Sequence, residues 1–186
     1  MNYNELDEFC RRWLQKADSY DTSVLSGAFD SFWSTFVAYN ALYNEVVNLR
    51  ISRNQVKPQD NGDKRSATVH VPDFLGHANM AHSIKDDPES WENVNKFTRL
   101  IKNRTFYIHS NKLGEPNYAE DRKCLRDIED GGDKEFCEAL MVLIYKTRCN
   151  MFHGGKKYHP DQAPLLNPMT KILRVVINQV LALLRE

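Results

Sequence analysis

The sequence has no long apolar run, no excess of charge of either sign and few glycines or prolines. No apolar stretch approaches the roughly 20 residues that a membrane-spanning helix needs, so no membrane association is expected. The formal net charge is +0 over 186 residues. This balance argues against a protein that holds nucleic acid by overall charge, because such affinity comes from neutralised phosphates. A small local basic site remains compatible with it.

The four cysteines show no metal-binding or disulfide pattern. Cys10, Cys124, Cys137 and Cys149 include no Cys-x-x-Cys pair, and a zinc site needs ligands in closely spaced pairs. Three of them fall in segments with helical spacing, where a free thiol packs as a small hydrophobe. We therefore expect reduced thiols, a cytoplasmic location, and neither a metal nor a cofactor.

Helical periodicity dominates what is present. Apolar residues recur with the spacing of a helical face, and the broadest stripe runs from Phe29 to Val47. This pattern predicts an all-α fold, a bundle of about five to six helices in a single domain over 1–186. The helical segments are 4–18, a second helix capped by residues 21–23, 89–110, 118–128, 134–152 and 168–185.

Residues 52–88 lack this periodicity. Pro58, Pro72, Gly76 and Pro88 interrupt the stretch, which predicts a long irregular connection with one short helix near 73–83. A connection of this length in a compact domain is often functional. Its segment 67–71 is the one place where residues alternate as in a strand.

Chemically useful side chains gather at the end of the 134–152 helix, in the segment Arg-Cys-Asn-Met-Phe-His-Gly-Gly. Arg148 can clamp a phosphate in bidentate fashion. His153 can act as base and acid near neutral pH, and Asn150 adds a donor and an acceptor. Gly154 lets a phosphodiester approach the backbone. These are the parts needed for metal-free RNA cleavage.

The Arg-x4-His spacing alone does not identify this segment as functional, because it occurs three times in the chain. Arg65 and His70 fall in the irregular stretch, and Arg104 and His109 fall at a frayed helix end. The third copy differs by closing a strong amphipathic helix, by containing Asn150, and by its Phe-His-Gly-Gly-Lys ending. Lys156 and Lys157 follow as candidate phosphate ligands.

Two segments resemble one family. Tyr145-Lys-Thr-Arg-Cys-Asn-Met-Phe-His-Gly-Gly-Lys156 is similar to the Arg-x4-6-His motif of the HEPN superfamily, in the version found in its abortive-infection-like bacterial branch. The run Phe32-Trp-Ser-Thr-Phe-Val-Ala-Tyr-Asn-Ala-Leu-Tyr43 resembles the early helix of the same branch. The resemblance covers most of the chain except residues 52–88.

The resemblance implies a helical bundle that dimerises, with two Arg/His pairs facing each other across a cleft. Such a cleft forms one metal-independent ribonuclease site, and active members leave a 2′,3′-cyclic phosphate. By position, Arg148 and His153 are the active pair, with Asn150 as the polar residue between them. The implied role is a toxin or antiphage-defence effector that acts on RNA, with an antitoxin or neighbouring defence protein as a further partner.

Two positions depart from the family pattern. Cys149 stands where Asn often follows the motif arginine, and Gly155 stands where related toxins carry a tyrosine. The second departure argues against control by adenylylation at that position.

Two other interpretations stay open at this point. The chain fits a non-catalytic HEPN module that binds a nucleotide, RNA or a partner protein. The zero net charge also fits a helical scaffold without a ligand, in which Arg148 pairs with an acid of a neighbouring helix and His153 caps a helix end.

Overall fold

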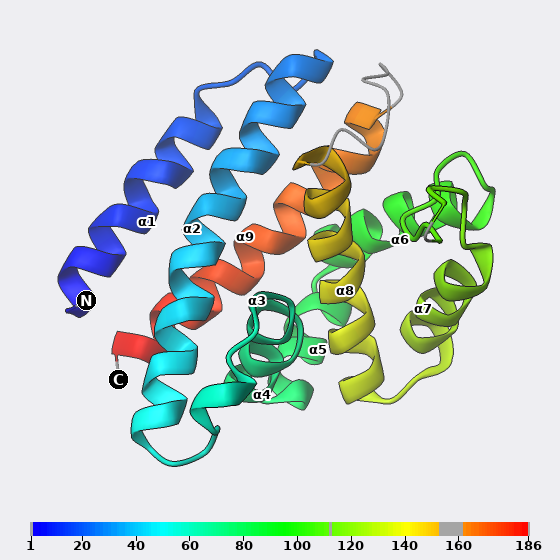
Figure 1. Ribbon diagram of the computed structural model, residues 1–186. Helices are drawn as coiled ribbons and strands as arrows, with labels where there is room; N and C mark the ends of the chain where they lie inside the picture. Colours follow the sequence, from blue (N-terminus) through cyan, green and yellow to red (C-terminus); the bar gives the residue numbers. More distant parts are fainter. Residues whose placement is uncertain (1, 112, 153–161, 186) are drawn as a thin grey trace.

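The computed structural model describes residues 2–111, 113–152 and 162–185, and in these ranges the fold is all-α, as predicted (Figure 1). Apart from helices, the described chain has connecting segments and one isolated bridge between Ser110 and Pro116. The helices in chain order are α1 (Tyr3–Asp18), α2 (Leu25–Ser52), the 3-10 helix η1 (Pro58–Asp60), α3 (Asp63–Arg65), the π-helix η2 (Ser66–His70), α4 (Val71–Leu75), α5 (His77–Lys85), α6 (Pro88–Lys102), α7 (Tyr118–Asp130), α8 (Asp133–Phe152) and α9 (Ala163–Arg185).

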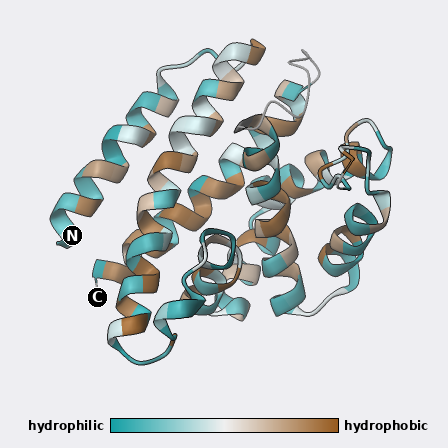
Figure 2. Cartoon of the chain, viewed as in Figure 1, coloured by the Kyte–Doolittle hydropathy of each residue, from teal (hydrophilic) through white to brown (hydrophobic). Residues whose placement is uncertain are grey.

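Helix α2 packs against helices from both the beginning and the end of the chain. It packs against α1 on one side, against α9 on another and against η2 on a third. Its aromatic residues Phe32, Tyr39 and Tyr43 are fully buried, because neighbours cover the helix on several sides. Figure 2 shows apolar residues recurring along α2, α8 and α9. One continuous hydrophobic cluster joins these helices to the rest of the domain.

The prediction of a long irregular connection over 52–88 was wrong. The segment contains η1, α3, η2, α4 and α5, so the helix count exceeds the predicted five to six. The strand-like alternation at 67–71 was also misleading, since most of it lies in the π-helix η2. The predicted short helix near 73–83 corresponds to the end of α4 and most of α5.

Packing explains why this segment is ordered as short helices. Ala67, Val71, Met80 and Ile84 are fully buried in the common core, so the segment contributes apolar area instead of looping over the surface. The residues that suggested irregular structure mark helix boundaries. Pro72 lies where the π-helix η2 passes into α4, and Gly76 turns the chain between α4 and α5 with a φ of 78°.

The two C-terminal helices form the frame around the candidate site. Helix α8 confirms the predicted helix over 134–152. Helix α9 begins at Ala163, before the predicted start at 168, and it includes Pro164 in its first turn. All four cysteines are free thiols, and burial raises the pKa of Cys10 to about 12. None of the described helices has the length and apolar content that crossing a membrane requires.

The buried position of α5 predicts that Ile84→Ala destabilises the whole domain. Ile84 is fully buried in the core, so its truncation leaves a cavity and costs about 2–5 kcal/mol of unfolding free energy. Leu113→Ala is the matched control, because Leu113 is 83% exposed and its truncation costs under about 0.5 kcal/mol. Chemical denaturation of both variants measures the difference. A wild-type midpoint for Ile84→Ala would mean that α5 is not part of the core.

Candidate functional site

The predicted site residues are divided between described and undescribed parts of the chain. Arg148 and Asn150 lie in the last turns of α8, which ends at Phe152. His153, Gly154, Lys156 and Lys157 lie outside the described residues. The structure therefore describes the surroundings of Arg148 and Asn150.

Arg148 is held by aromatic rings and an acid from the N-terminal half of the chain. Its guanidinium carbon lies 5.3 Å from the ring centroid of Phe36 and 5.8 Å from that of Trp33, both on α2. Its Nη1 lies 3.9 Å from Oδ2 of Asp63, the first residue of α3. A guanidinium is weakly hydrated and stacks well on aromatic faces. The side chain is 20% exposed, so its charge is fixed in place while part of it still faces solvent.

Asp63 joins three separate helices at this point. Its carboxylate accepts a hydrogen bond from the hydroxyl of Tyr43 on α2 and one of 2.6 Å from the hydroxyl of Tyr145 on α8. These two bonds fix the carboxylate beside Arg148. The carboxylate side chain is half exposed, so its pair with Arg148 adds little to overall stability. Its main effect is to orient the guanidinium.

The two tyrosines act as donors to Asp63 in their protonated form. Burial, followed by the hydrogen bond to Asp63, raises the pKa of Tyr43 above its ordinary value. The same two causes raise the pKa of Tyr145. Both hydroxyls therefore keep their protons well above neutral pH, and the arrangement around Arg148 does not change with their ionisation in the physiological range.

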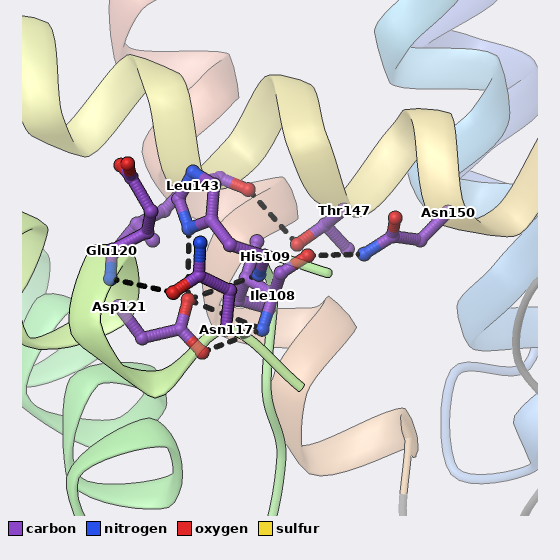
Figure 3. Close-up of polar contacts among 8 residues, drawn as sticks. All are labelled: Ile108, His109, Asn117, Glu120, Asp121, Leu143, Thr147 and Asn150. Carbon is purple, nitrogen blue, oxygen red and sulfur yellow. Dashed lines mark hydrogen bonds and ion pairs between the residues drawn. The ribbon is translucent and has the colours of Figure 1, made fainter. Parts of the chain in front are cut away.

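Asn150 links the end of α8 to the connection between α6 and α7. Its Nδ2 donates a 2.6 Å hydrogen bond to the carbonyl oxygen of Ile108 (Figure 3). Ile108 is buried, so this bond satisfies a carbonyl that water does not reach. Asn150 thus has a structural task in addition to the role predicted for it, and its remaining polar atom, Oδ1, is an acceptor.

The same connection is fixed from its other side by Asp121 of α7. This carboxylate is 2% exposed. It accepts hydrogen bonds from the backbone N–H of Ile108 at 3.0 Å and of His109 at 3.0 Å, and Nδ1 of His109 lies 2.9 Å from it (Figure 3). Residues 108–109 are therefore clamped between α7 and α8. No pattern in the sequence indicated that Asp121 binds residues 108–109. The only hint was the position of an acidic residue in the first turn of a predicted helix.

The histidines of the two other Arg-x4-His pairs have structural surroundings. His70 is 3% exposed, and its Nε2 lies 3.0 Å from the carbonyl oxygen of Asp60. His109 is bound to Asp121, in an irregular connection instead of the predicted helix end, because α6 already stops at Lys102. In the third copy, the guanidinium of Arg148 packs on two aromatic rings and lies near Asp63.

A small apolar pocket lies beside Asn150. Its volume is about 240 Å³, and it opens between α8, α9 and the 103–117 connection. Ligand sites in proteins are concave and mostly apolar with a few polar groups, and this pocket has that character. Its lining residues are Phe29, Phe106, Ile108, Thr147, Asn150, Met151, Gln162, Leu165 and Leu166. No group of three or more His, Cys, Asp or Glu side chains within the described ranges is placed to hold a metal ion.

The bond between Asn150 and Ile108 predicts a measurable loss in Asn150→Ala. The substitution leaves the buried carbonyl of Ile108 without its donor, which costs about 1–3 kcal/mol of unfolding free energy. Hydrogen exchange of the backbone amides of 103–117 should become faster than in the wild type. Asn44→Ala is a suitable control, since Asn44 bonds Asn40 on the exposed side of α2. Unchanged exchange in 103–117 would contradict the structural task of Asn150.

The raised pKa of Tyr43 predicts a dependence of stability on alkaline pH. Its pKa is higher in the folded than in the unfolded state, so its contribution is complete below its ordinary pKa of 10.0 and declines as pH rises through and above it. Tyr43→Phe lacks this contribution. The stability difference between wild type and Tyr43→Phe should therefore shrink by up to about 1.4 kcal/mol per pH unit above pH 10. Denaturation midpoints measured from about pH 8 to 11 test this, and parallel profiles would contradict it.

The chain matches no protein-family model, no curated protein and no solved structure. The geometry that holds Arg148 is therefore the structural observation that bears on function.

Proposed function

We propose that this protein is a metal-independent endoribonuclease that acts as a toxin or antiphage-defence effector. The observation that carries the proposal is the placement of Arg148. Its guanidinium is fixed by Phe36, Trp33 and Asp63 in the last turns of α8. It precedes His153 by five positions in the segment that resembles the HEPN motif.

The proposed chemistry uses the 2′-hydroxyl of RNA as the nucleophile. His153 takes the proton of that hydroxyl while the 2′ oxygen forms a bond to phosphorus. The bond from phosphorus to the 5′ oxygen breaks, and the leaving 5′ oxygen takes a proton from water. Arg148 stabilises the charge that develops on the phosphate oxygens. The products are a 2′,3′-cyclic phosphate and a 5′-hydroxyl.

The HEPN resemblance implies a site shared by two copies of the chain. Arg148 lies in the last turns of α8, and His153 comes directly after the last residue of that helix in the sequence. A two-fold axis near the end of α8 would bring the arginine of each copy toward the histidine of the other.

The remaining predicted residues have supporting roles in this proposal. Gly154, Lys156 and Lys157 bind the substrate backbone, through close approach and through charge. Asn150 holds the end of α8 in register through Ile108 and offers its Oδ1 to the substrate. Asp63 keeps the guanidinium oriented before RNA arrives, and an arginine has enough donors to hold a carboxylate and a phosphate together.

Cleavage of RNA in EDTA tests the proposal. The wild type should cleave single-stranded RNA to products with 2′,3′-cyclic phosphate ends, and His153→Ala should lower the rate about 10²–10⁴-fold. Arg148→Lys should also lose activity, since it keeps the charge and loses the bidentate fork. His82→Ala is the matched control, because His82 is an exposed histidine on α5.

Two outcomes would contradict the endoribonuclease. Equal cleavage by the wild type and His153→Ala would assign the activity to another group or to a contaminant. No cleavage by either protein, together with tight binding of a nucleotide, would assign the chain to the non-catalytic HEPN module.

A further inference from the structure

Three arginines gather on the surface where α6 ends and α7 begins. Arg104 follows the end of α6, while Arg122 and Arg126 lie one turn apart on α7. All three are exposed, and together they line a recess of about 280 Å³ whose wall includes Tyr118. We refer to Arg104, Arg122 and Arg126 as the arginine patch.

The arginine patch carries an excess of positive charge, although the chain as a whole has a formal net charge of +0. Lys102 in the same recess is neutralised by Glu129 at 2.8 Å. Across the described ranges, none of the three arginines of the patch forms an ion pair with a carboxylate. Asp121 also borders the recess, but it is buried and engaged with His109. Three guanidinium groups are thus left facing one recess.

Arg104 occupies a backbone position that does not suit an arginine. Its φ is 58°, in the left-handed region, directly after the end of α6. The N–H of Thr105 turns back to the carbonyl of Leu100 at 3.0 Å, which completes a helix C-cap of the kind that normally uses glycine. Asn54, at the end of α2, is the other described non-glycine residue with positive φ, and asparagine tolerates this conformation. An arginine at such a position points to a task for its side chain.

The side chain of Arg104 is positioned for stacking. Its guanidinium carbon lies 5.1 Å from the ring centroid of Tyr118, and the ring of Tyr107 meets that of Tyr118 edge to face. A guanidinium supported on one side by an aromatic ring presents its other face as a flat cationic surface. Unstacked bases of single-stranded RNA bind to such surfaces, and the adjacent backbone binds to neighbouring arginines.

We infer that the arginine patch binds single-stranded RNA, with Arg122 and Arg126 on the phosphodiester backbone and Arg104 stacked on a base. The choice of RNA over other polyanions rests on the proposed function. Position supports it as well. Arg104 precedes Ile108 by four residues, so their Cα atoms are at most about 14 Å apart, and Ile108 bonds Asn150 at the end of α8. One RNA strand can therefore reach from the patch to the proposed site.

Binding of a fluorescent single-stranded RNA, with methylated 2′-hydroxyls so that it cannot be cleaved, tests this inference. The triple variant Arg104→Gln, Arg122→Gln, Arg126→Gln should bind about tenfold or more weakly at moderate salt. Its plot of log affinity against log salt concentration should be shallower by about 1.4, since the phosphate contacts of Arg122 and Arg126 are lost and each contributes about 0.7. The control triple Arg11→Gln, Arg12→Gln, Arg53→Gln removes the same charge from exposed positions elsewhere and should bind nearly as the wild type does.

Arg104→Gly separates binding from folding. Glycine accepts the left-handed conformation without strain, so the melting temperature should stay equal or rise while RNA affinity falls. Affinity at the wild-type level in the patch triple, or equal losses in the patch and control triples, would overturn the inference. So would an absence of RNA binding by the wild type, or binding of heparin by the same arginines as tightly as RNA. RNA bound through the patch by a wild type that cleaves no RNA would instead contradict the proposed function alone.

Discussion

The structure depends on how two buried tyrosine hydroxyls on α2 are satisfied. Tyr39 and Tyr43 have no exposed surface, and a buried hydroxyl without a partner costs about 1–3 kcal/mol. Their acceptors are the carbonyl of Ala67 and the carboxylate of Asp63. The segment that carries these acceptors must therefore fold against α2. The same requirement places Asp63 beside Arg148, so the packing of the core and the orientation of the proposed phosphate ligand have a common origin.

Long amphipathic helices could be predicted from the sequence, whereas the short buried ones could not. The helix over 134–152 was predicted because polar and apolar residues alternate with its period over several turns. In 63–85 the helices are too short for a period to develop, and the buried residues lie on more than one side. In the sequence, prolines and a glycine at the ends of short helices look the same as the prolines and glycines of an irregular loop. Pro72 and Gly76 have this effect in α4 and α5.

The candidate site was predictable only in the part that lies on one helix. Arg148 and Asn150 stand out because they lie near the end of the helix that was predicted over 134–152. Asp63 gave no signal, since it lies 82 positions from Tyr145 in the sequence and meets it only through tertiary packing. The role of Asp121 likewise depends on tertiary contacts, because its carboxylate accepts hydrogen bonds from backbone N–H groups of another segment. Contacts of this kind depend on the arrangement of several helices, which no local pattern encodes.

In the proposed ribonuclease, the end of α8 is half of a site that a second copy of the chain completes. Mixing two inactive variants, Arg148→Gln and His153→Ala, tests it directly, because a mixed dimer regains one arginine and one histidine on opposite copies. RNA cleavage in EDTA should return when the two variants are unfolded and refolded together. A co-refolded mixture that forms mixed dimers, yet stays as inactive as each variant alone, would contradict it.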